Sequence, residues 1–370
     1  MSYERMTCRL CMGRVWTTYT FEPTPIANLF PKRDNEGELF PLSLKQCEAC
    51  QHVQIGHVIE DSVLYGANYK YSTPSALTPK LRDRAVQLRK EYPDAELVLE
   101  IGANNGMFLR SLYFAGFPRF CGIDPSSKDA HVWAMPFDMK AAKIVRNNVQ
   151  KADLIVANNV FAHIDDLQEV FRAIDYVLSD DGAVVFEVQY LIPMMLFGTF
   201  DMVYHEHRDY HHLAPIASFL RSFDMVMTDW EILDDHAGSI RVTAKRSGKQ
   251  KPLPKEDINW RDFDDAIEAN RRRLLSALPD RIAAFGAPAK ATTLIHHFGI
   301  KDRIRYCVDD TPQKQGTFLA GTSIPVFDRN SMEKKMLLLS WNYADIIKKQ
   351  FPDVEFILPF DVREVEALAA

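Results

Sequence analysis

Four consecutive side chains that can exchange protons stand out in this sequence, namely Tyr204, His205, Glu206 and His207. Phenol, imidazole and carboxyl groups act as acids and bases in enzymes. Far upstream, residues 100–106 read as the end of a buried strand followed by a glycine-rich turn, a pattern typical of a nucleoside cofactor site. Together, the two stretches predict an enzyme that removes a proton and transfers a group to the resulting anion.

The cofactor turn lies between a predicted strand at residues 97–101 and a predicted helix at 107–115. Glycines let the backbone approach a ligand closely, and the start of the helix offers free N–H groups. Roughly twenty residues later, a second apolar run ends in Asp124, whose carboxylate can bind a ribose diol. We therefore predict cofactor contacts from Glu100, Gly102, Asn104, Gly106, Asp124 and Asn158.

The spacing Glu-x-Gly-x-x-x-Gly resembles class I S-adenosylmethionine-dependent methyltransferases more than dinucleotide-binding enzymes. A Rossmann-type fold that binds another ligand remains the alternative. The segment at residues 125–133 is short and leaves little room for a helix after Asp124, so we expect an altered adenine side of the pocket.

Two Cys-x-x-Cys pairs occur near the N-terminus, at Cys8 and Cys11 and at Cys47 and Cys50. In a reducing compartment, thiolates at this spacing predict a tetrahedral zinc site rather than disulfides. Four sulfur ligands leave no open position, so the zinc should be structural. Chance pairing or a redox motif is the alternative, and His52 and His57 follow as reserve ligands. Cys121 and Cys307 lie in apolar runs and are predicted core residues.

Apolar runs alternate with amphipathic stretches through most of the chain, which predicts an α/β protein with parallel sheets. Its 370 residues are enough for two or three domains. We expect a small zinc-binding module at residues 1–75, a Rossmann-like methyltransferase domain at 76–246, and a linker helix with a Rossmann-like domain at 247–370. The polar stretch at 247–254 is the predicted linker.

The composition excludes several classes of function. A net charge of −6 argues against non-specific nucleic-acid binding, which depends on Lys and Arg at phosphates. No apolar stretch reaches about 18 residues, so we expect no membrane span. The N-terminus lacks the apolar segment of a secretion signal, which makes the cytoplasm the default location. No heptad pattern indicates an oligomeric state.

The order of motifs along the chain resembles the sugar C-methyltransferases, which methylate a ring carbon of nucleotide-linked keto-deoxysugars. That order is the cysteine pairs, the cofactor turn, Tyr-x-Glu-His at 204–207, Gly-Ala-x-Ala-Lys at 286–290, and the long motif at 308–326. The resemblance covers essentially the whole chain. It implies His207 as the base, Tyr204 and Glu206 beside the sugar, and His163 and Tyr71 around it.

The same resemblance implies a nucleotide-linked keto sugar as substrate, with dTDP or GDP as the expected carrier, S-adenosylmethionine as methyl donor and a structural zinc. An O- or N-methyltransferase acting on a related sugar or small metabolite remains open. So does a nucleotide-sugar-binding protein without turnover. At the turn 286–290, Lys290 and Thr292 could meet a diphosphate, or the C-terminal domain could merely close the active site.

Overall fold

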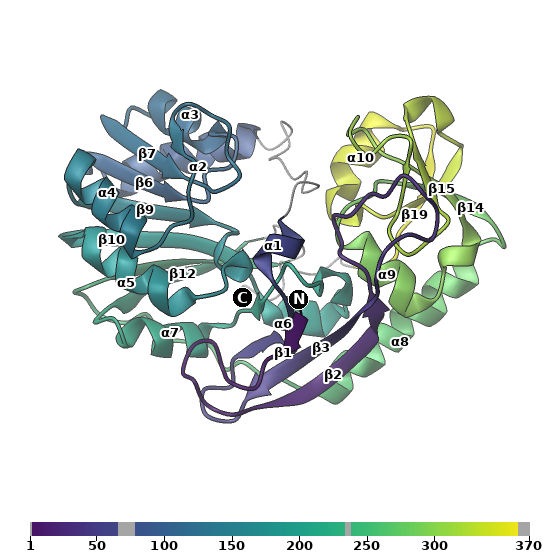
Figure 1. Ribbon diagram of the computed structural model, residues 1–370, viewed down its shortest axis with the longest axis horizontal. Helices are drawn as coiled ribbons and strands as arrows, with labels where there is room; N and C mark the ends of the chain where they lie inside the picture. Colours follow the sequence, from purple (N-terminus) through teal and green to yellow (C-terminus); the bar gives the residue numbers. More distant parts are fainter. Residues whose placement is uncertain (1, 66–77, 234–237, 362–370) are drawn as a thin grey trace.

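The computed structural model of the chain describes residues 2–65, 78–233 and 238–361. Within these ranges, two α/β lobes are joined by a smaller module built mainly of strands (Figure 1). Each lobe contains one open, largely parallel sheet, so the predicted α/β fold class is confirmed.

The N-terminal module is a four-stranded antiparallel sheet in the order β11-β4-β3-β2, with a separate β1-β5 pair beside it. Its first strand in this order, β11 (Asp209–Tyr210), comes from the middle of the chain and directly follows the Tyr204–His207 cluster. The other elements are β1 (Ser2–Glu4), β2 (Val15–Thr24), β3 (Phe40–Cys47), β4 (Val53–Ile55), β5 (His57–Ile59) and α1 (Asp61–Leu64). The cluster is thus attached to the N-terminal module.

The middle lobe is a seven-stranded sheet in the order β12-β13-β10-β9-β6-β7-β8. Strands β6 to β10 are parallel, and β13 runs antiparallel to β10 and β12. The strands are β6 (Leu97–Ile101), β7 (Arg119–Ile123), β8 (Val132–Trp133), β9 (Ala152–Asn158), β10 (Leu178–Gln189), β12 (Val226–Leu233) and β13 (Ser239–Lys245). The strand order reverses between β6 and β9, which is where ligands bind in sheets of this kind.

Helices cover both faces of this sheet because its strands are apolar on both sides. Leu97, Leu99 and Ile101 of β6 pack in the cluster that holds α4, α5 and α7, whereas Val98 packs with α2 and α3. The helices on these faces are α2 (Thr78–Glu91), α3 (Met107–Phe114), α4 (Met139–Val149), α5 (Leu167–Val177) and α7 (Leu213–Arg221), with the 3₁₀ turn η2 (Phe161–His163). The helix α6 (Leu191–Phe197) and the 3₁₀ turn η3 (Phe200–Met202) pack instead with the N-terminal module and the C-terminal lobe.

The C-terminal lobe is a six-stranded sheet in the order β16-β17-β15-β14-β18-β19, in which only β16 is antiparallel. Its strands are β14 (Ile282–Phe285), β15 (Ile304–Val308), β16 (Thr317–Phe318), β17 (Pro325–Phe327), β18 (Lys335–Leu338) and β19 (Glu355–Ile357). Its helices are α8 (Trp260–Ala277), α9 (Ala291–Phe298) and α10 (Ala344–Gln350), with 3₁₀ turns η5 (Lys301–Arg303), η6 (Arg329–Ser331) and η7 (Trp341–Tyr343). Residues 247–254, the predicted linker, form no helix or strand.

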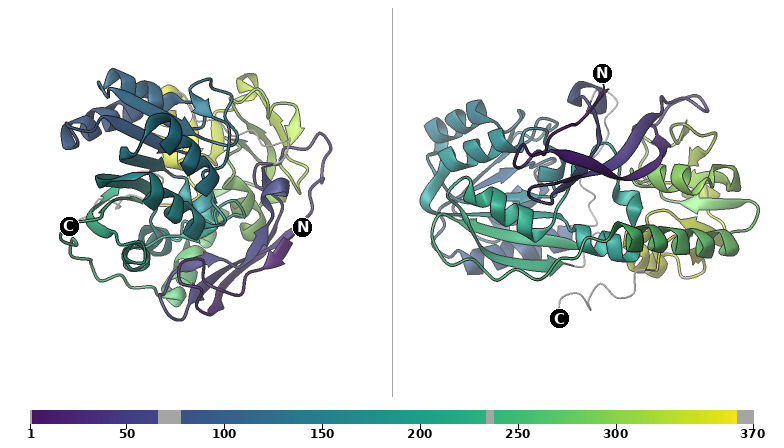
Figure 2. Two further views of the ribbon diagram at one scale, coloured as in Figure 1. Left: turned by 60° about the vertical axis from the view of Figure 1, so that its left-hand side comes forward. Right: turned by 90° about the horizontal axis from the view of Figure 1, so that it is seen from below.

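The N-terminal module lies across the junction of the two lobes (Figure 2). An aromatic chain runs through this junction, with ring centroids 5.9 Å apart for Phe21 and Phe200 and 4.8 Å apart for Phe200 and Phe298. The loop after β2 also contacts the C-terminal lobe, where Phe318 donates its backbone N–H to the carbonyl of Pro31 at 2.9 Å. The module therefore fixes how the two lobes face each other.

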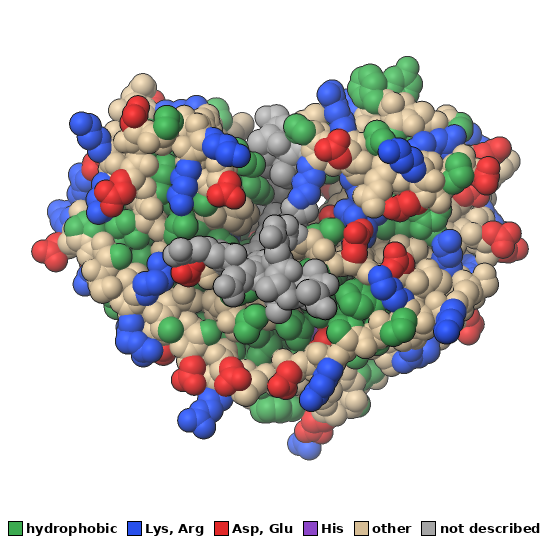
Figure 3. Space-filling view, turned by 180° about the vertical axis from the view of Figure 1, so that it is seen from behind, with side chains coloured by type: hydrophobic (Ala, Val, Ile, Leu, Met, Phe, Trp, Pro, Cys, Tyr) green, Lys and Arg blue, Asp and Glu red, His purple; other side chains and the backbone are tan. Residues whose placement is uncertain are grey.

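Seen from behind, the molecule shows its two lobes side by side, with acidic and basic side chains interspersed over both (Figure 3). Among the residues that the structure describes, none of the helices combines the length and apolar character needed to cross a bilayer.

Candidate active site

His207 lies at the point where the middle lobe meets the N-terminal sheet. Its Nδ1 is 3.0 Å from the carbonyl oxygen of Met202, and its Nε2 is 2.8 Å from the hydroxyl of Tyr204. A carbonyl can only accept, so Nδ1 of the neutral ring carries the proton and Nε2 carries the lone pair. The phenol of Tyr204 is buried and donates to that lone pair. The geometry therefore prepares Nε2 to accept a proton.

His163 packs edge-on against this base. The centroids of the His163 and His207 rings are 4.8 Å apart, and the hydroxyl of Tyr65 lies 3.4 Å from Nδ1 of His163. Burial, and secondarily the charge of Arg208, lowers the pKa of His163 to about 4. His163 is therefore uncharged near neutral pH, so it does not oppose formation of a positive charge on His207.

Glu206 is almost fully buried and contacts a residue that sequence reasoning missed. The side-chain amide of Asn28 donates to both carboxylate oxygens of Glu206, at 2.9 and 2.7 Å. Burial raises the pKa of Glu206 to about 7, while the hydrogen bonds from Asn28 oppose that rise. Asn28 comes from the loop after β2, which no motif marked as functional. The pKa of Glu206 thus lies near neutrality, and the hydrogen bonds from Asn28 stabilise its ionised form.

Tyr204, Glu206, His207 and His163 are thereby brought to one place, whereas the fifth predicted catalytic residue, Tyr71, lies outside the described residues. The neighbouring histidines, interpreted as bystanders from the sequence, contact protein groups or are buried. His205 donates from Nε2 to the carbonyl of Pro41 at 3.1 Å, and His212 contacts Glu256 at 3.1 Å.

The predicted cofactor residues gather at the carboxyl ends of β6, β7 and β9. Gly102 and Gly106 have positive φ values of 76° and 68°, and Asn104 has one of 44°. Asp124 directly follows β7 and accepts the backbone N–H of Asn104 through Oδ2 at 3.0 Å, so this carboxylate braces the turn. Oδ1 of the same residue accepts from Ser126. The turn is therefore held open by glycines and fixed from the next strand.

Two buried polar atoms at this edge lack a partner among the described residues, namely Oε2 of Glu100 and Nδ2 of Asn158. Burial, together with the charge of Asp124, raises the pKa of Glu100. Buried polar atoms are normally hydrogen-bonded, so an acceptor and a donor left over at a strand-order reversal fit a polar ligand. Residues 125–133 contain only β8 and no helix, as the sequence predicted.

The four cysteines of the two pairs form one cluster. Their sulfur atoms all lie within 4.8 Å of one another, with contacts of 3.6 Å between Cys8 and Cys50 and 3.5 Å from Cys11 to Cys47 and Cys50. Four sulfurs about 2.3 Å from one zinc ion stand roughly 3.8 Å apart, so the donor set fits zinc. His52 contacts Asp209 at 2.8 Å instead, and His57 lies on β5, so neither reserve ligand belongs to the cluster.

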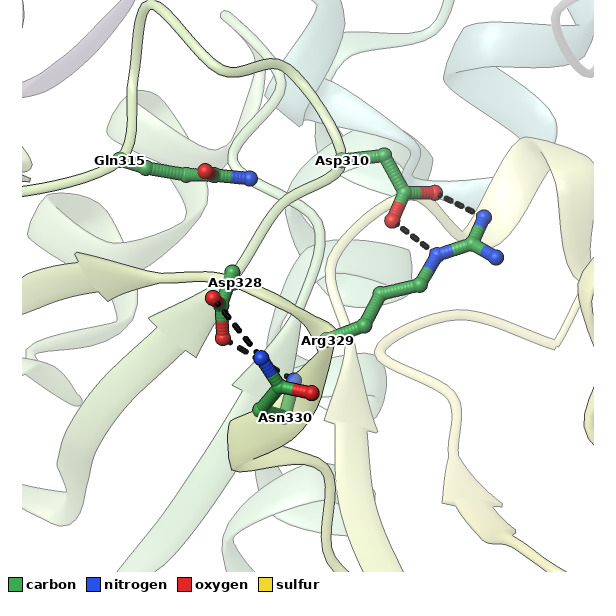
Figure 4. Close-up of a pocket in the computed structure, with 5 residues that line it drawn as sticks. All are labelled: Asp310, Gln315, Asp328, Arg329 and Asn330. Carbon is green, nitrogen blue, oxygen red and sulfur yellow. Dashed lines mark hydrogen bonds and ion pairs between the residues drawn. The ribbon is translucent and has the colours of Figure 1, made fainter.

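The C-terminal lobe repeats part of the cofactor turn. Gly286 follows β14 with a φ of 87°, and Asp309, after β15, accepts the backbone N–H of Ala287 at 2.7 Å. Lys290 is directed inward, because its Nζ lies 3.6 Å from the ring centroid of Trp341 and is buried. An open pocket of about 350 Å³ lies beyond β15 and β17, lined by Asp310, Gln315, Asp328, Arg329 and Asn330 (Figure 4).

Three family models match the chain: a zinc binding domain at residues 8–65, a methyltransferase domain at 75–228, and a C-methyltransferase C-terminal domain at 255–359. The sequence is also 31% identical to the C-methyltransferase NovU of Streptomyces niveus, over 95% of this chain and 94% of that protein. The chain belongs to the C-methyltransferase family. It is a methyltransferase that uses S-adenosylmethionine and carries an N-terminal zinc-binding domain, as predicted.

Solved structures resemble parts of the chain. A SAM-dependent methyltransferase from Archaeoglobus fulgidus is 14% identical with a TM-score of 0.38, covering 45% of this chain and 94% of that one. A second, from Clostridium acetobutylicum, is 15% identical with a TM-score of 0.35, covering 51% of this chain and 96% of that one.

Replacing Cys47 by Ser should remove zinc from this C-methyltransferase and destabilise its N-terminal module. A serine hydroxyl is a poor zinc ligand, and binding of the metal contributes to folding of small modules. We expect zinc content to fall from about one ion per chain to less than half, with an earlier thermal transition. The measurement is elemental analysis with differential scanning calorimetry. Cys121→Ala, which removes a buried core thiol, should leave the zinc content unchanged.

Proposed function

We propose that this C-methyltransferase methylates an enolisable ring carbon of a nucleotide-linked keto-deoxysugar, with His207 as the base. The observation that carries this proposal is the hydrogen bonding of His207, which leaves the lone pair on Nε2 beside Tyr204. A carbon next to a carbonyl becomes nucleophilic only after its proton is removed, so C-methylation needs such a base. Methyl transfer to oxygen or nitrogen can proceed with a weaker base, because these atoms already carry a lone pair.

In the proposed reaction, Nε2 of His207 takes the proton of the carbon beside the sugar carbonyl. The C–H electron pair stays on the sugar, which becomes an enolate, and the same carbon then forms its new bond to the methyl group. Tyr204 turns its O–H from Nε2 to the enolate oxygen, which it stabilises as a hydrogen-bond donor. We propose that His163 and Tyr71 border the same oxygen. S-adenosylmethionine, when bound, would supply the electrophilic methyl group, and its methyl–sulfur bond would break as the carbon–methyl bond forms, leaving S-adenosylhomocysteine.

The cofactor would be held by the turn after β6. We propose that Asp124 binds the ribose diol, that Glu100 and Asn158 use their buried polar atoms toward the cofactor, and that the backbone at Gly102, Asn104 and Gly106 lines its path. The orphaned atoms and the positive φ values support this assignment. The four clustered cysteines, Cys8, Cys11, Cys47 and Cys50, would bind the zinc, and the boundaries at 75/76 and 246/247 remain our proposed domain division.

We assign the nucleotide half of the substrate to the C-terminal lobe. Its central strands run in the doubly wound order β17-β15-β14-β18-β19, and its glycine turn is braced by Asp309 as the cofactor turn is braced by Asp124. Sheets of this order bind ligands beyond the carboxyl ends of their strands. The inward placement of Lys290 favours a structural role for that side chain over a contact with diphosphate, and an unchanged KM in Lys290→Ala would agree.

Replacing Asn28 by Leu should move the acid limb of the kcat/KM profile to higher pH. The amide stabilises the ionised form of Glu206, so its loss raises the pKa of that carboxyl above about 7. If the carboxylate supports the imidazolium formed on His207, activity at pH 7 falls and recovers as the pH rises. A hydrogen bond to a charged group is worth about 1.5–3 kcal/mol, which corresponds to about one to two pH units.

The matched control for Asn28→Leu is Asn35→Gly, which removes an amide on the same loop that donates to Ser323 at 2.8 Å and suits the positive φ of 53° at that position. The control profile should coincide with the wild type. Identical acid limbs in all three proteins would show that Glu206 is not the titrating group.

The proposed substrate class is tested by mass spectrometry of reactions with S-adenosylmethionine and a panel of dTDP-, GDP- and UDP-linked keto-deoxysugars. A product one methylene heavier from one carrier identifies the nucleotide. Methylation of a small metabolite without the nucleotide would favour the O- or N-methyltransferase alternative. Nucleotide-sugar binding without turnover in any reaction would favour a binding protein, and neither outcome is compatible with the proposal.

A further inference from the structure

Arg9 lies between the zinc-cluster residues Cys8 and Cys11, and its side chain contacts both the N-terminal sheet and the middle lobe. The guanidinium is almost completely buried and pairs with the carboxylate of Asp209, whose side chain has no exposed area. Its Nη2 also donates to the carbonyls of Ile164 and Asp165, the latter at 2.8 Å. One side chain from the cysteine cluster therefore contacts the segment after His163 and the segment after His207.

The second cysteine pair reaches the same carboxylate. His52, two residues after Cys50, contacts the other oxygen of Asp209 at 2.8 Å, and both side chains are fully buried. Asp209 is also paired through the backbone, since β11 forms an antiparallel bridge with β4 at Gln54. Asp209 is thus tied to both halves of the cysteine cluster, one residue beyond Arg208 and two beyond His207.

Further hydrogen bonds fix the backbone around Arg9 to β4 and to the middle lobe. The side-chain oxygen of Gln54 accepts the backbone N–H of Arg9 at 2.9 Å, while its amide donates to the carbonyl of Thr7 at 3.0 Å. On the middle lobe, Gln168 of α5 donates to the carbonyl of Leu10 at 2.6 Å. The first cysteine pair is consequently seated on the middle lobe next to the His163 segment, and not only on its own sheet.

Such an arrangement is demanding, because a buried ion pair is expensive to desolvate and is retained where its geometry matters. A planar guanidinium presents five N–H donors in a rigid fork, so it holds several partners in one fixed geometry, which the rotatable ammonium of a lysine does not impose. Here one direction leads to Asp209 and the other to the carbonyls of Ile164 and Asp165. The bonds join the two segments whose histidine rings lie 4.8 Å apart.

We propose that Arg9 and Asp209 are positioning residues that set the spacing between His163 and His207, so that the cysteine cluster governs the geometry of the active site. We call Arg9, Asp209 and the carbonyls of Ile164 and Asp165 the Arg9 clamp. This inference rests on the proposed role of His207. It predicts that losing the clamp lowers turnover while the cofactor site, on other strands, is unaffected.

The test variant is the pair Arg9→Met with Asp209→Asn, which removes both charges and leaves no unpaired buried ion. Its control is Arg246→Met with Asp175→Asn, a more exposed pair in which Arg246 bonds both the carboxylate and the backbone carbonyl of Asp175. Zinc content, S-adenosylmethionine affinity, kcat, KM and hydrogen–deuterium exchange of peptides covering 159–166 and 203–210 are measured for each protein.

We expect the clamp variant to keep its zinc and to bind S-adenosylmethionine within about twofold of the wild type, while kcat falls about 100-fold, since small displacements of catalytic groups cost this much. KM should change much less, both peptides should exchange faster, and Arg9→Lys should give an intermediate kcat. Chelation of zinc should accelerate exchange of the same peptides in the wild type and add little in the clamp variant.

Unchanged exchange of both peptides would overturn the clamp, whatever the kinetics show. An equal loss in the control pair, or loss of zinc and cofactor binding together with kcat, would also overturn it, because the effect would then be general unfolding. If His207→Ala keeps its turnover while the clamp variant exchanges faster, the proposed role of His207 fails and the clamp stands.

Discussion

His207→Ala is expected to lower kcat about 10³-fold or more, within the range by which a positioned general base accelerates a reaction. The variant loses Nε2 of His207, whose lone pair faces the Tyr204 hydroxyl because Nδ1 donates its proton to the Met202 carbonyl. Binding of S-adenosylmethionine should remain, since the cofactor turn follows β6, an element other than the one that carries the ring. Steady-state assays and calorimetric titration of the cofactor measure the two effects.

His205→Gln is the matched control, because His205 lies two residues away and, though more deeply buried than His207, donates to the carbonyl of Pro41, a bond that glutamine can reproduce. It should turn over at close to the wild-type rate. Substantial activity in His207→Ala would point to methyl transfer that needs no strong base, as in the O- or N-methyltransferase alternative.

Gly102→Ala should abolish most cofactor binding, with an affinity loss of about 100-fold or more, equivalent to about 2.7 kcal/mol. The backbone there has a φ of 76°, and an added Cβ would lie 2.2 Å from Cγ2 of Val160. A non-glycine residue is strained in this conformation, and the contact forces the turn or Val160 to move. Titration calorimetry with S-adenosylmethionine measures the loss.

The control variant Gly116→Ala separates backbone strain from the steric contact with Val160. Gly116 has a similar φ of 85°, but an added Cβ would meet nothing within 4 Å. This control should cost some stability through backbone strain and leave cofactor affinity unchanged. Equal cofactor affinity in Gly102→Ala and the wild type would remove the turn after β6 from the cofactor site.

Local patterns predicted the fold well where elements are short and sharply bounded. The strand at 97–101 was predicted with the bounds that the structure has, and the helix predicted at 107–115 ends one residue earlier, at Phe114, because the apolar run ends at a glycine turn and the helix begins just after it. The clustering of the cysteines also followed from spacing alone, since two residues between thiols suit one metal.

The supports of the site could not be predicted in this way, because they depend on contacts between distant segments. Asn28 lies 178 positions from Glu206, and Arg9 lies 200 from Asp209. Neither belongs to a periodic or metal-ligand pattern. The pairing of β11 with β4 is likewise invisible locally, since two residues carry no recognisable strand signal. For Lys290, the sequence indicated a turn but not the inward direction of the side chain.

The most direct test of the central claim is the position of the transferred methyl group. Reaction with S-adenosylmethionine labelled with carbon-13 in its methyl group, followed by NMR of the nucleotide-sugar product, reveals which atom the label is bonded to. We predict a one-bond coupling between the label and a ring carbon beside the carbonyl. A label bonded to oxygen or nitrogen would contradict C-methylation through an enolate formed by His207.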